Sequence, residues 1–233
     1  MPSADLSDQY EPGLADYLSR FVTPDRLQRF AEVLAERTRY VTVAVEDIYQ
    51  PHNASAVLRT CDAFGIQDVH IIENRNTYRL NPSVELGTAQ WLTLHRHRGP
   101  GDNTEAAVND LRSAGYRIVA TSPHARQQEI ENLDLAAGPV AVLFGTEKEG
   151  LTETALSMAD EYVAIPMYGF VESFNISVSA ALVLYRLSRQ LRSSGIDYHL
   201  TDQERNVLTL RWLRASISRV EALERSYREG NPQ

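Results

Sequence analysis

The chain has one cysteine, one lysine and no long apolar run. The single cysteine, Cys61, excludes an internal disulfide framework and a cysteine-ligated zinc cluster, and it favours a reducing compartment. No apolar segment approaches the length that crosses a bilayer, so no membrane-spanning helix is expected. The polar, acidic start MPSADLSDQYEPG does not have the pattern of a signal peptide. We therefore expect a cytoplasmic protein.

Several motifs of nucleotide binding and hydrolysis are also missing. There is no G-x-G-x-x-G, G-x-S-x-G or H-E-x-x-H sequence. Gly145 and Gly150 have the glycine spacing of a P-loop, but Leu151 stands where the phosphate-binding lysine would follow. His95 and His97 would share one face of a strand and could bind a metal with a carboxylate. We interpret that pair as a solvated strand end, and no metal site is expected.

The composition suits a globular protein with an uneven charge. Of the 233 residues, 43% are hydrophobic, which is enough for a packed core in one domain with appendages. The net charge of −8 argues against a nucleic-acid partner for the chain as a whole. The regional balance, however, is −2 over residues 1–39, −9 over 40–185 and +3 over 186–233. The basic C-terminal segment, whose basic residues are all arginine, keeps a nucleic-acid partner open.

Strand and helix patterns alternate through the middle of the chain. Helices are expected at 54–64, 104–114 and 152–158, and strands at 41–45, 69–73, 91–94, 117–121, 140–144 and 162–165. This alternation predicts an α/β fold with a mostly parallel sheet and helices on both of its faces.

The two ends of the chain are predicted to be helical. A disordered lead precedes a helix at 24–37, with Thr23 as its N-cap. A helix is expected at 176–192, and its opening part, ISVSAALVLY, has apolar residues on most faces and should be buried on more than one side. A last helix begins at Thr201 with capping-box spacing, and one apolar stripe follows along it. The stripe consists of Leu210, Leu213, Ile217 and Val220.

Three segments place polar residues at the ends of predicted strands, where ligands bind in open α/β sheets. The first is PHNASAVLRTCDAFG (51–65), with Asn53 at a helix entrance and Arg59 six residues later. The second is VLFGTEKEGL (142–151), in which Gly145 would let the backbone approach a ligand. The third is IPMYGFVESFNISVS (165–179), whose backbone N–H groups at a helix start can receive an anion. Each segment alone is equally consistent with caps and solvated turns.

Together, the three segments resemble in order and spacing the motifs of the SPOUT RNA methyltransferases, most closely the TrmH type, the tRNA (guanosine-2′-O-)methyltransferases. The matching core is N-x-x-A-x-x-R-T-C-D-A-F-G, L-F-G-T-E-K-E-G-L and I-P-M-x-G-x-x-x-S-x-N-x-S-V-S, within residues 39–192. Phe174 departs from the family, which usually has leucine there. The resemblance implies a C-terminal deep trefoil knot, S-adenosylmethionine as the cofactor, and a homodimer packed through the knot.

The same resemblance assigns roles to residues. It implies that Arg59 is catalytic in methyl transfer to a ribose 2′-hydroxyl, either as a base aided by an RNA phosphate or as an electrostatic positioner. Four further residues are expected to orient Arg59, shape the loops and hold cofactor or ribose: Asn53, Glu147, Ser173 and Asn175. The expected cofactor-binding residues are Thr121, Ser122, Pro123, Gly145, Ile165, Met167, Phe174 and Asn175. No metal is required.

These expectations divide the chain into three parts: a lead with an N-terminal helical extension (1–39), a methyltransferase domain (40–192) and an arginine-rich C-terminal helical extension (193–233). Short helical flanks resemble those of the tRNA enzymes, so the favoured substrate is guanosine 18 in the D-loop of tRNA. Ribosomal RNA, another tRNA position and a non-catalytic RNA-binding protein stay open as alternatives. RNA should contact local arginine patches, and the expected residues are Arg26, Arg29, Arg37, Arg211 and Arg214.

Overall fold

The computed structural model describes residues 11–79, 87–122 and 128–230. The chain forms two compact units. An α/β unit spans Thr38–Tyr198, and a helical unit combines residues from both ends of the chain, 11–37 and 199–230 among those described. None of the helices in the described parts has both the length and the apolar character needed to span a membrane.

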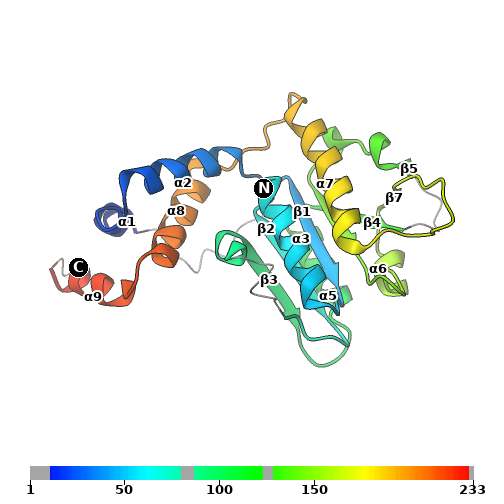
Figure 1. Ribbon diagram of the computed structural model, residues 1–233, viewed down its shortest axis with the longest axis horizontal. Coiled ribbons are helices and arrows are strands. Elements are labelled where there is room, and N and C mark those ends of the chain that lie inside the picture. The colour runs from blue at the N-terminus through cyan, green and yellow to red at the C-terminus, as the bar shows by residue number, and fades with distance from the viewer. Residues whose placement is uncertain (1–10, 80–86, 123–127, 231–233) are drawn as a thin grey trace. The chain divides into compact units, whose positions relative to one another are not determined.

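The described strands of the α/β unit form one seven-stranded parallel sheet (Figure 1). The strands are β1 (Val41–Glu46), β2 (Asp68–Glu73), β3 (Thr93–Arg98), β4 (Arg117–Thr121), β5 (Gln128–Glu129), β6 (Val140–Phe144) and β7 (Glu161–Ala164). Their order is β3-β2-β1-β6-β4-β7-β5, and every neighbouring pair is parallel. β1 and β6 lie centrally and are wholly buried, which explains their apolar sequences. The predicted parallel α/β fold is confirmed.

Helices cover both faces of this sheet, as predicted. On one face, α3 (Pro51–Ala63) packs against α7 (Ile176–Arg192), and their buried residues share a core with Val43 and Val45 of β1. On the other face, α5 (Thr104–Ser113) and α6 (Glu153–Ser157) bury Ala44 of the same strand. Alternate residues of β1 therefore serve two separate cores, as the period of a strand requires. Short 3₁₀ helices occupy Thr88–Trp91, Ile130–Asn132 and Leu135–Ala137.

Two predicted boundaries shift for local reasons. The strand predicted at 91–94 begins at Thr93 and continues to Arg98, because Thr88–Trp91 turns as a 3₁₀ helix. The helix predicted from residue 54 begins at Pro51, since proline suits the first position of a helix.

Within a single chain the helix α7 is buried on one side, so burial on more than one side stays a prediction that depends on a partner. Its inner face includes Leu184 and Leu187, which are fully buried. On its outer face Val178, Leu182 and Tyr185 are 44%, 41% and 57% exposed. These three residues, the outer stripe of α7, are spaced as neighbours along one side of a helix.

The helical unit contains α1 (Pro12–Ser19), α2 (Pro24–Glu36), α8 (Asp202–Ser216) and α9 (Val220–Gly230). Leu14 and Leu18 of α1 are fully buried, and α1 packs against α8 and α9. The rings of Phe30 in α2 and Trp212 in α8 meet edge to face, with 5.4 Å between their centroids. The predicted disordered lead is therefore wrong over residues 12–19, while residues 1–10 lie outside the described part.

The last predicted helix is two helices. The capping box of Thr201 and Glu204 is present as predicted, but α8 ends at Ser216 and Ile217 is extended. Arg219 has a left-handed φ of 59°, and α9 then starts in a new direction. An ion pair of 2.7 Å between Arg214 and Glu224 links the two helices, and Tyr227 contacts Tyr17 of α1. Packing against α1 thus interrupts a stripe that periodicity alone would continue.

Candidate functional site

A chain of hydrogen bonds connects the three polar segments that follow the carboxyl ends of the strands. The buried side-chain amide of Asn53 donates to the carboxylate of Glu147, which follows β6. The side-chain oxygen of Asn53, Oδ1, accepts a hydrogen bond of 3.2 Å from Asn175 Nδ2. Asn175 in turn caps α7 by accepting from the backbone N–H (2.9 Å) and the hydroxyl (2.6 Å) of Ser177. Asn53 is not itself a cap, because Gln50 is the N-cap of α3.

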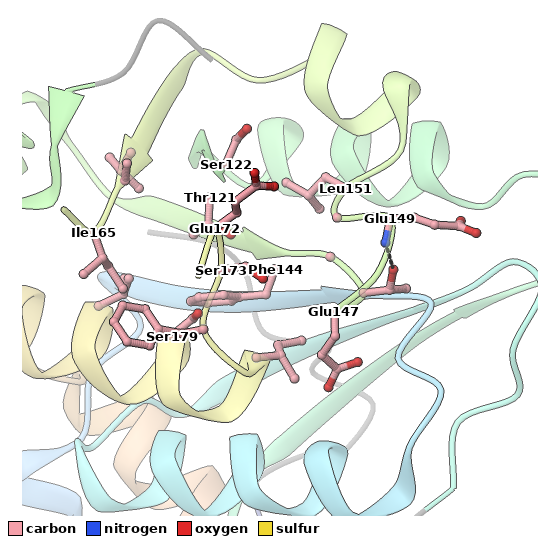
Figure 2. A pocket seen from close by; sticks show the side chains of 18 of the residues that line it. Thr121, Ser122, Phe144, Glu147, Glu149, Leu151, Ile165, Glu172, Ser173 and Ser179 are labelled. Atoms are coloured by element: carbon pink, nitrogen blue, oxygen red, sulfur yellow. Dashed lines mark hydrogen bonds between the residues drawn. The ribbon is translucent and has the colours of Figure 1, made fainter. Parts of the chain in front are cut away.

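Residues at the carboxyl ends of β4, β6 and β7 line a cavity of about 330 Å³ (Figure 2). Glu147 belongs both to this lining and to the chain of hydrogen bonds. Eight predicted site residues line it: Thr121, Ser122, Gly145, Glu147, Ile165, Met167, Ser173 and Phe174. Pro123 lies outside the described residues, and Asn53 and Asn175 are not among the residues that line the cavity. Apolar walls come from Leu151, Leu156, Val163 and Val183, whereas Lys148, Glu149 and Glu172 bring charge. The cavity combines an apolar interior with polar groups, as sites for small molecules commonly do.

Gly145 is required by the closure of its own loop. Thr146 and Gly150 form an antiparallel bridge with two backbone hydrogen bonds of 3.0 Å. A Cβ on Gly145 would collide with the backbone of Gly150 and Leu151. The sequence predicts this glycine for close approach of a ligand, but the atoms nearest to its Cβ position belong to Gly150 and Leu151 of the turn.

Two buried carboxylates, Asp47 and Glu46, hold the loops around the cavity. The sequence motifs do not point to either of them. Asp47 adopts a left-handed φ of 56° directly after β1 and accepts from the backbone N–H groups of Asn74, Arg75 and Asn76. Burial alone would raise the pKa of Asp47, but these hydrogen bonds and the Arg75 side chain hold it below its usual value. Arg75 also donates to Glu149 at 2.6 Å, which ties the turn after β6 to the end of β2.

The neighbouring Glu46 is equally buried and joins two helix starts. Its carboxylate accepts from the hydroxyls of Thr104 (2.6 Å) and Thr152 (2.7 Å) and from the backbone N–H of Thr152 (2.8 Å). These contacts fix α5 and α6 to the end of β1. The one sequence signal for both acids is the pair Glu46-Asp47 at the end of an apolar strand.

Arg59 is not brought to the cavity of its own chain. It is exposed on α3, six residues after Asn53, and it does not line the cavity. Six residues correspond to about 600° of helical rotation, which turns the two side chains to different sides of α3. Within one chain, hydrogen bonds join Asn53, Glu147 and Asn175, whereas Arg59 is not among the residues that line the cavity.

The histidine pair on β3 is not a solvated strand end. His95 Nε2 lies 3.0 Å from a carboxylate oxygen of Asp68, and His97 Nε2 lies 3.0 Å from His70 Nδ1 on β2. Burial, and then the neighbouring His95 and His97, lower the pKa of His70 to about 3. Among the residues that the structure describes, no group of three or more potential ligands is arranged to hold a metal ion.

The predicted RNA-contacting arginines differ in their surroundings. Arg37 is 1% exposed and its guanidinium lies 5.6 Å from the ring centroid of Trp212, so we remove it from that set. Arg214 is paired with Glu224, and Arg211 is half-buried. Arg26 and Arg29 are exposed on α2, where they make long contacts to Ser216 (3.3 Å) and Glu32 (3.4 Å).

Comparison with known proteins identifies relatives of the whole α/β unit. Residues 40–185 match the model of the SpoU rRNA Methylase family. The tRNA (guanosine(18)-2′-O)-methyltransferase of Borreliella burgdorferi is 44% identical over 207 residues, which cover 89% of this chain and 93% of the relative. The enzyme of the same name from Escherichia coli K12 is 37% identical, over 75% of this chain and 74% of the relative.

Solved structures agree with these relatives. The TrmH/SpoU tRNA modifying enzyme of A. aeolicus has a TM-score of 0.74 at 26% identity, covering 84% of this chain and 98% of that one. The SpoU methyltransferase AviRb from Streptomyces viridochromogenes, solved with AdoMet, has a TM-score of 0.57 at 26% identity, covering 70% and 62%. From its matched sequence and fold, the chain belongs to the SpoU methylase family.

Proposed function

We propose that this protein methylates the ribose 2′-hydroxyl of guanosine 18 in tRNA, with S-adenosylmethionine as the methyl donor. The observation that carries the proposal is the hydrogen-bonded set of Asn53, Glu147 and Asn175, which joins three loops beside one cavity. The names of the relatives from Borreliella burgdorferi and Escherichia coli support the choice of reaction and substrate. AviRb, a family neighbour, was solved with AdoMet, which supports the choice of cofactor.

The cavity suits S-adenosylmethionine. Its volume of about 330 Å³ is within the range of small-molecule sites, and its apolar side chains can receive a purine ring. Glu149 and Glu172 at the wall bring negative charge toward a cationic ligand. When bound, the cofactor supplies an electrophilic methyl group on a sulfonium centre. Gly145 and Ile165 line the cavity, and their backbone groups would hold the adenosine.

The chain's own residues then have to align a ribose with that methyl group. Asn53 and Asn175 hold the loops in a single arrangement, because each amide is hydrogen-bonded on both of its polar atoms or to a helix start. Positioning of this kind supplies a large part of the rate acceleration. Arg59 is the proposed catalytic residue. A free arginine side chain is a very poor base. Arg59 would therefore stabilise developing negative charge, or act as a base only beside an RNA phosphate.

We further propose a homodimer and a knotted C-terminal segment. The outer stripe of α7, Val178, Leu182 and Tyr185, supports the homodimer because a second copy would bury its apolar surface. The knot is proposed from the family resemblance, supported by the loops after β6 and β7 lining one cavity. Sedimentation should give a dimer for the natural chain and a monomer for Leu182→Glu. A monomeric natural chain would contradict the dimer.

RNA contacts outside the cavity are proposed for the helical unit. Arg26 and Arg29 lie exposed on one helix and Arg211 is partly exposed on another, which suits contact with phosphates. Arg214 would have to leave Glu224 to join them. Binding of tRNA should therefore weaken clearly as the salt concentration rises.

The test incubates the protein with methyl-labelled S-adenosylmethionine and an unmodified tRNA transcript, and maps the labelled nucleotide. We expect label on the ribose of guanosine 18. Two controls are a transcript with adenosine at that position and a ribosomal RNA transcript. Label confined to ribosomal RNA would identify ribosomal RNA as the substrate. Label confined to another tRNA nucleotide would identify that position as the target. Cofactor and RNA binding without any methylation would make the protein a non-catalytic RNA binder.

A further inference from the structure

The only lysine of the chain lies at the wall of the cavity. Lys148 is exposed, and it stands in the turn that the two hydrogen bonds between Thr146 and Gly150 close. The turn is further held by a hydrogen bond of 3.1 Å from the backbone N–H of Glu149 to Thr146 Oγ1, drawn in Figure 2. The backbone that carries Lys148 is thus fixed, whereas its side chain is long and reaches solvent.

Both acidic neighbours of Lys148 are engaged elsewhere. Glu147 accepts from Asn53, and Glu149 accepts from Arg75 at 2.6 Å. Figure 2 shows the two glutamate side chains pointing in different directions. No ion pair of Lys148 with another described residue is formed, although residues 40–185 carry a balance of −9. The loop therefore presents an ammonium group whose adjacent carboxylates are already occupied.

An ammonium in this position is suited to one particular anion. Lysine binds phosphate as a compact point charge. The 2′-oxygen and the 3′-oxygen of a ribose stand on adjacent carbons, so a ribose whose 2′-hydroxyl enters the cavity brings its 3′-phosphodiester to the same rim. One cation in an acidic region would not attract RNA over a distance, but it can hold one phosphate locally.

We propose that Lys148 Nζ binds the phosphodiester on the 3′ side of the target ribose and thereby positions the 2′-hydroxyl. Lys148 is a positioning residue in this scheme, since it touches the phosphate and not the reacting atoms. The inference rests on the proposed RNA methylation and adds a residue that the motif comparison did not assign. The competing anion at the same rim is the carboxylate of S-adenosylmethionine.

Kinetics of two Lys148 variants test the proposal. Lys148→Gln should lower kcat/KM for tRNA by about 10-fold or more, because a charge-assisted contact is lost. The dissociation constant for S-adenosylmethionine, measured by calorimetry, should stay within about 2-fold, and Lys148→Arg should keep most of the activity. The slope of log K for tRNA against log salt should fall by about 0.7 to 0.9 in Lys148→Gln. Arg98→Ala, which removes an exposed cation on β3, three strands from β6, is the matched control.

Amine footprinting gives an independent readout, because Lys148 carries the only side-chain amine of the chain. The natural protein is treated with an acetylating reagent and Lys148 modification is followed by mass spectrometry. Protection by tRNA, but not by S-adenosylmethionine alone, is expected. Protection by the cofactor alone, together with weaker cofactor binding in Lys148→Gln, would assign the lysine to the cofactor carboxylate and overturn the proposal. Unchanged kinetics in Lys148→Gln would overturn it as well.

These outcomes separate the inference from the proposed function. If the natural protein methylates tRNA and Lys148→Gln does so equally well, only the role of Lys148 is wrong. If the natural protein methylates no RNA, the proposed function itself fails.

Discussion

Asn53 and Glu147 are 94 residues apart in the sequence, and the side chain of one donates a hydrogen bond to the other. The contact joins the first turn of α3 to the loop after β6, and the second amide contact of Asn53 reaches Asn175 at the start of α7. Asn53 is 3% exposed, so neither contact is easily replaced by water. The loops around the cavity therefore depend on one buried amide.

Asn53→Asp should disable the site by placing a second carboxylate against Glu147. We expect a loss of about 1 to 3 kcal/mol in the free energy of unfolding and a large loss of methylation. The double variant Asn53→Asp/Glu147→Gln restores one donor and one acceptor and should recover part of both. Urea unfolding and initial rates measure this, with exposed Asn109→Asp on α5 as the control. An Asn53→Asp variant as stable and active as the natural protein would contradict the bridging role.

Gly145→Ala should damage the cavity, because the added methyl group collides with the backbone of Gly150 and Leu151. The expected cost is about 1 to 3 kcal/mol of stability, with weaker binding of S-adenosylmethionine. Gly169→Ala is the matched control, since a Cβ there meets no atom within 4 Å. Thermal unfolding and calorimetric titration compare the two variants. Equal behaviour of the pair would show that the turn can relax around a side chain.

Arg59→Ala should abolish turnover while sparing cofactor binding, because Arg59 does not line the cavity. We expect kcat to fall by about 100-fold or more, as for loss of a proton-transfer or charge-stabilising group. The dissociation constant for S-adenosylmethionine should stay unchanged. Arg98→Ala, which also removes an exposed arginine, should keep normal activity. Near-normal methylation by Arg59→Ala would make the catalytic assignment wrong.

His70 should make stability depend on pH. Its ordinary pKa of 6.5 is lowered to about 3 in the folded protein by burial and by His95 and His97. Between these two values the unfolded chain binds more protons, so the free energy of unfolding falls as the pH drops below about 6.5, by up to about 1.4 kcal/mol per pH unit.

Urea unfolding between pH 7 and about 4 measures this slope. His70→Gln should flatten it, whereas exposed His52→Gln should leave it unchanged. Burial alone would raise the pKa of Asp68, but His95 and Arg39 hold it below its usual value. Protonation of this carboxylate therefore lowers the free energy of unfolding further only at lower pH. The same slope in His70→Gln and in the natural protein would rule out this origin.

Local patterns in the sequence determined the elements that depend on near neighbours. Val140–Phe144 is an apolar strand, and it lies at the centre of the sheet. Thr201 and Glu204 form the capping box that their spacing predicts, because both partners lie within one turn of helix. All three polar segments needed the family resemblance as well, since each alone is consistent with helix caps and ordinary turns.

Features that depend on distant partners follow from tertiary packing. The break at residues 217–219 and the burial of Arg37 over Trp212 contradict what periodicity or charge alone predicts. The outer stripe of α7 is exposed in a single chain, which periodicity alone does not show. Glu46 and Asp47 accept hydrogen bonds from residues up to 106 positions away in the sequence, and no local pattern predicts these contacts. The order of residues establishes which of them can form strands, caps and hydrogen bonds. Which of them meet was decided by packing, because a buried polar group must find its partner wherever the fold places one.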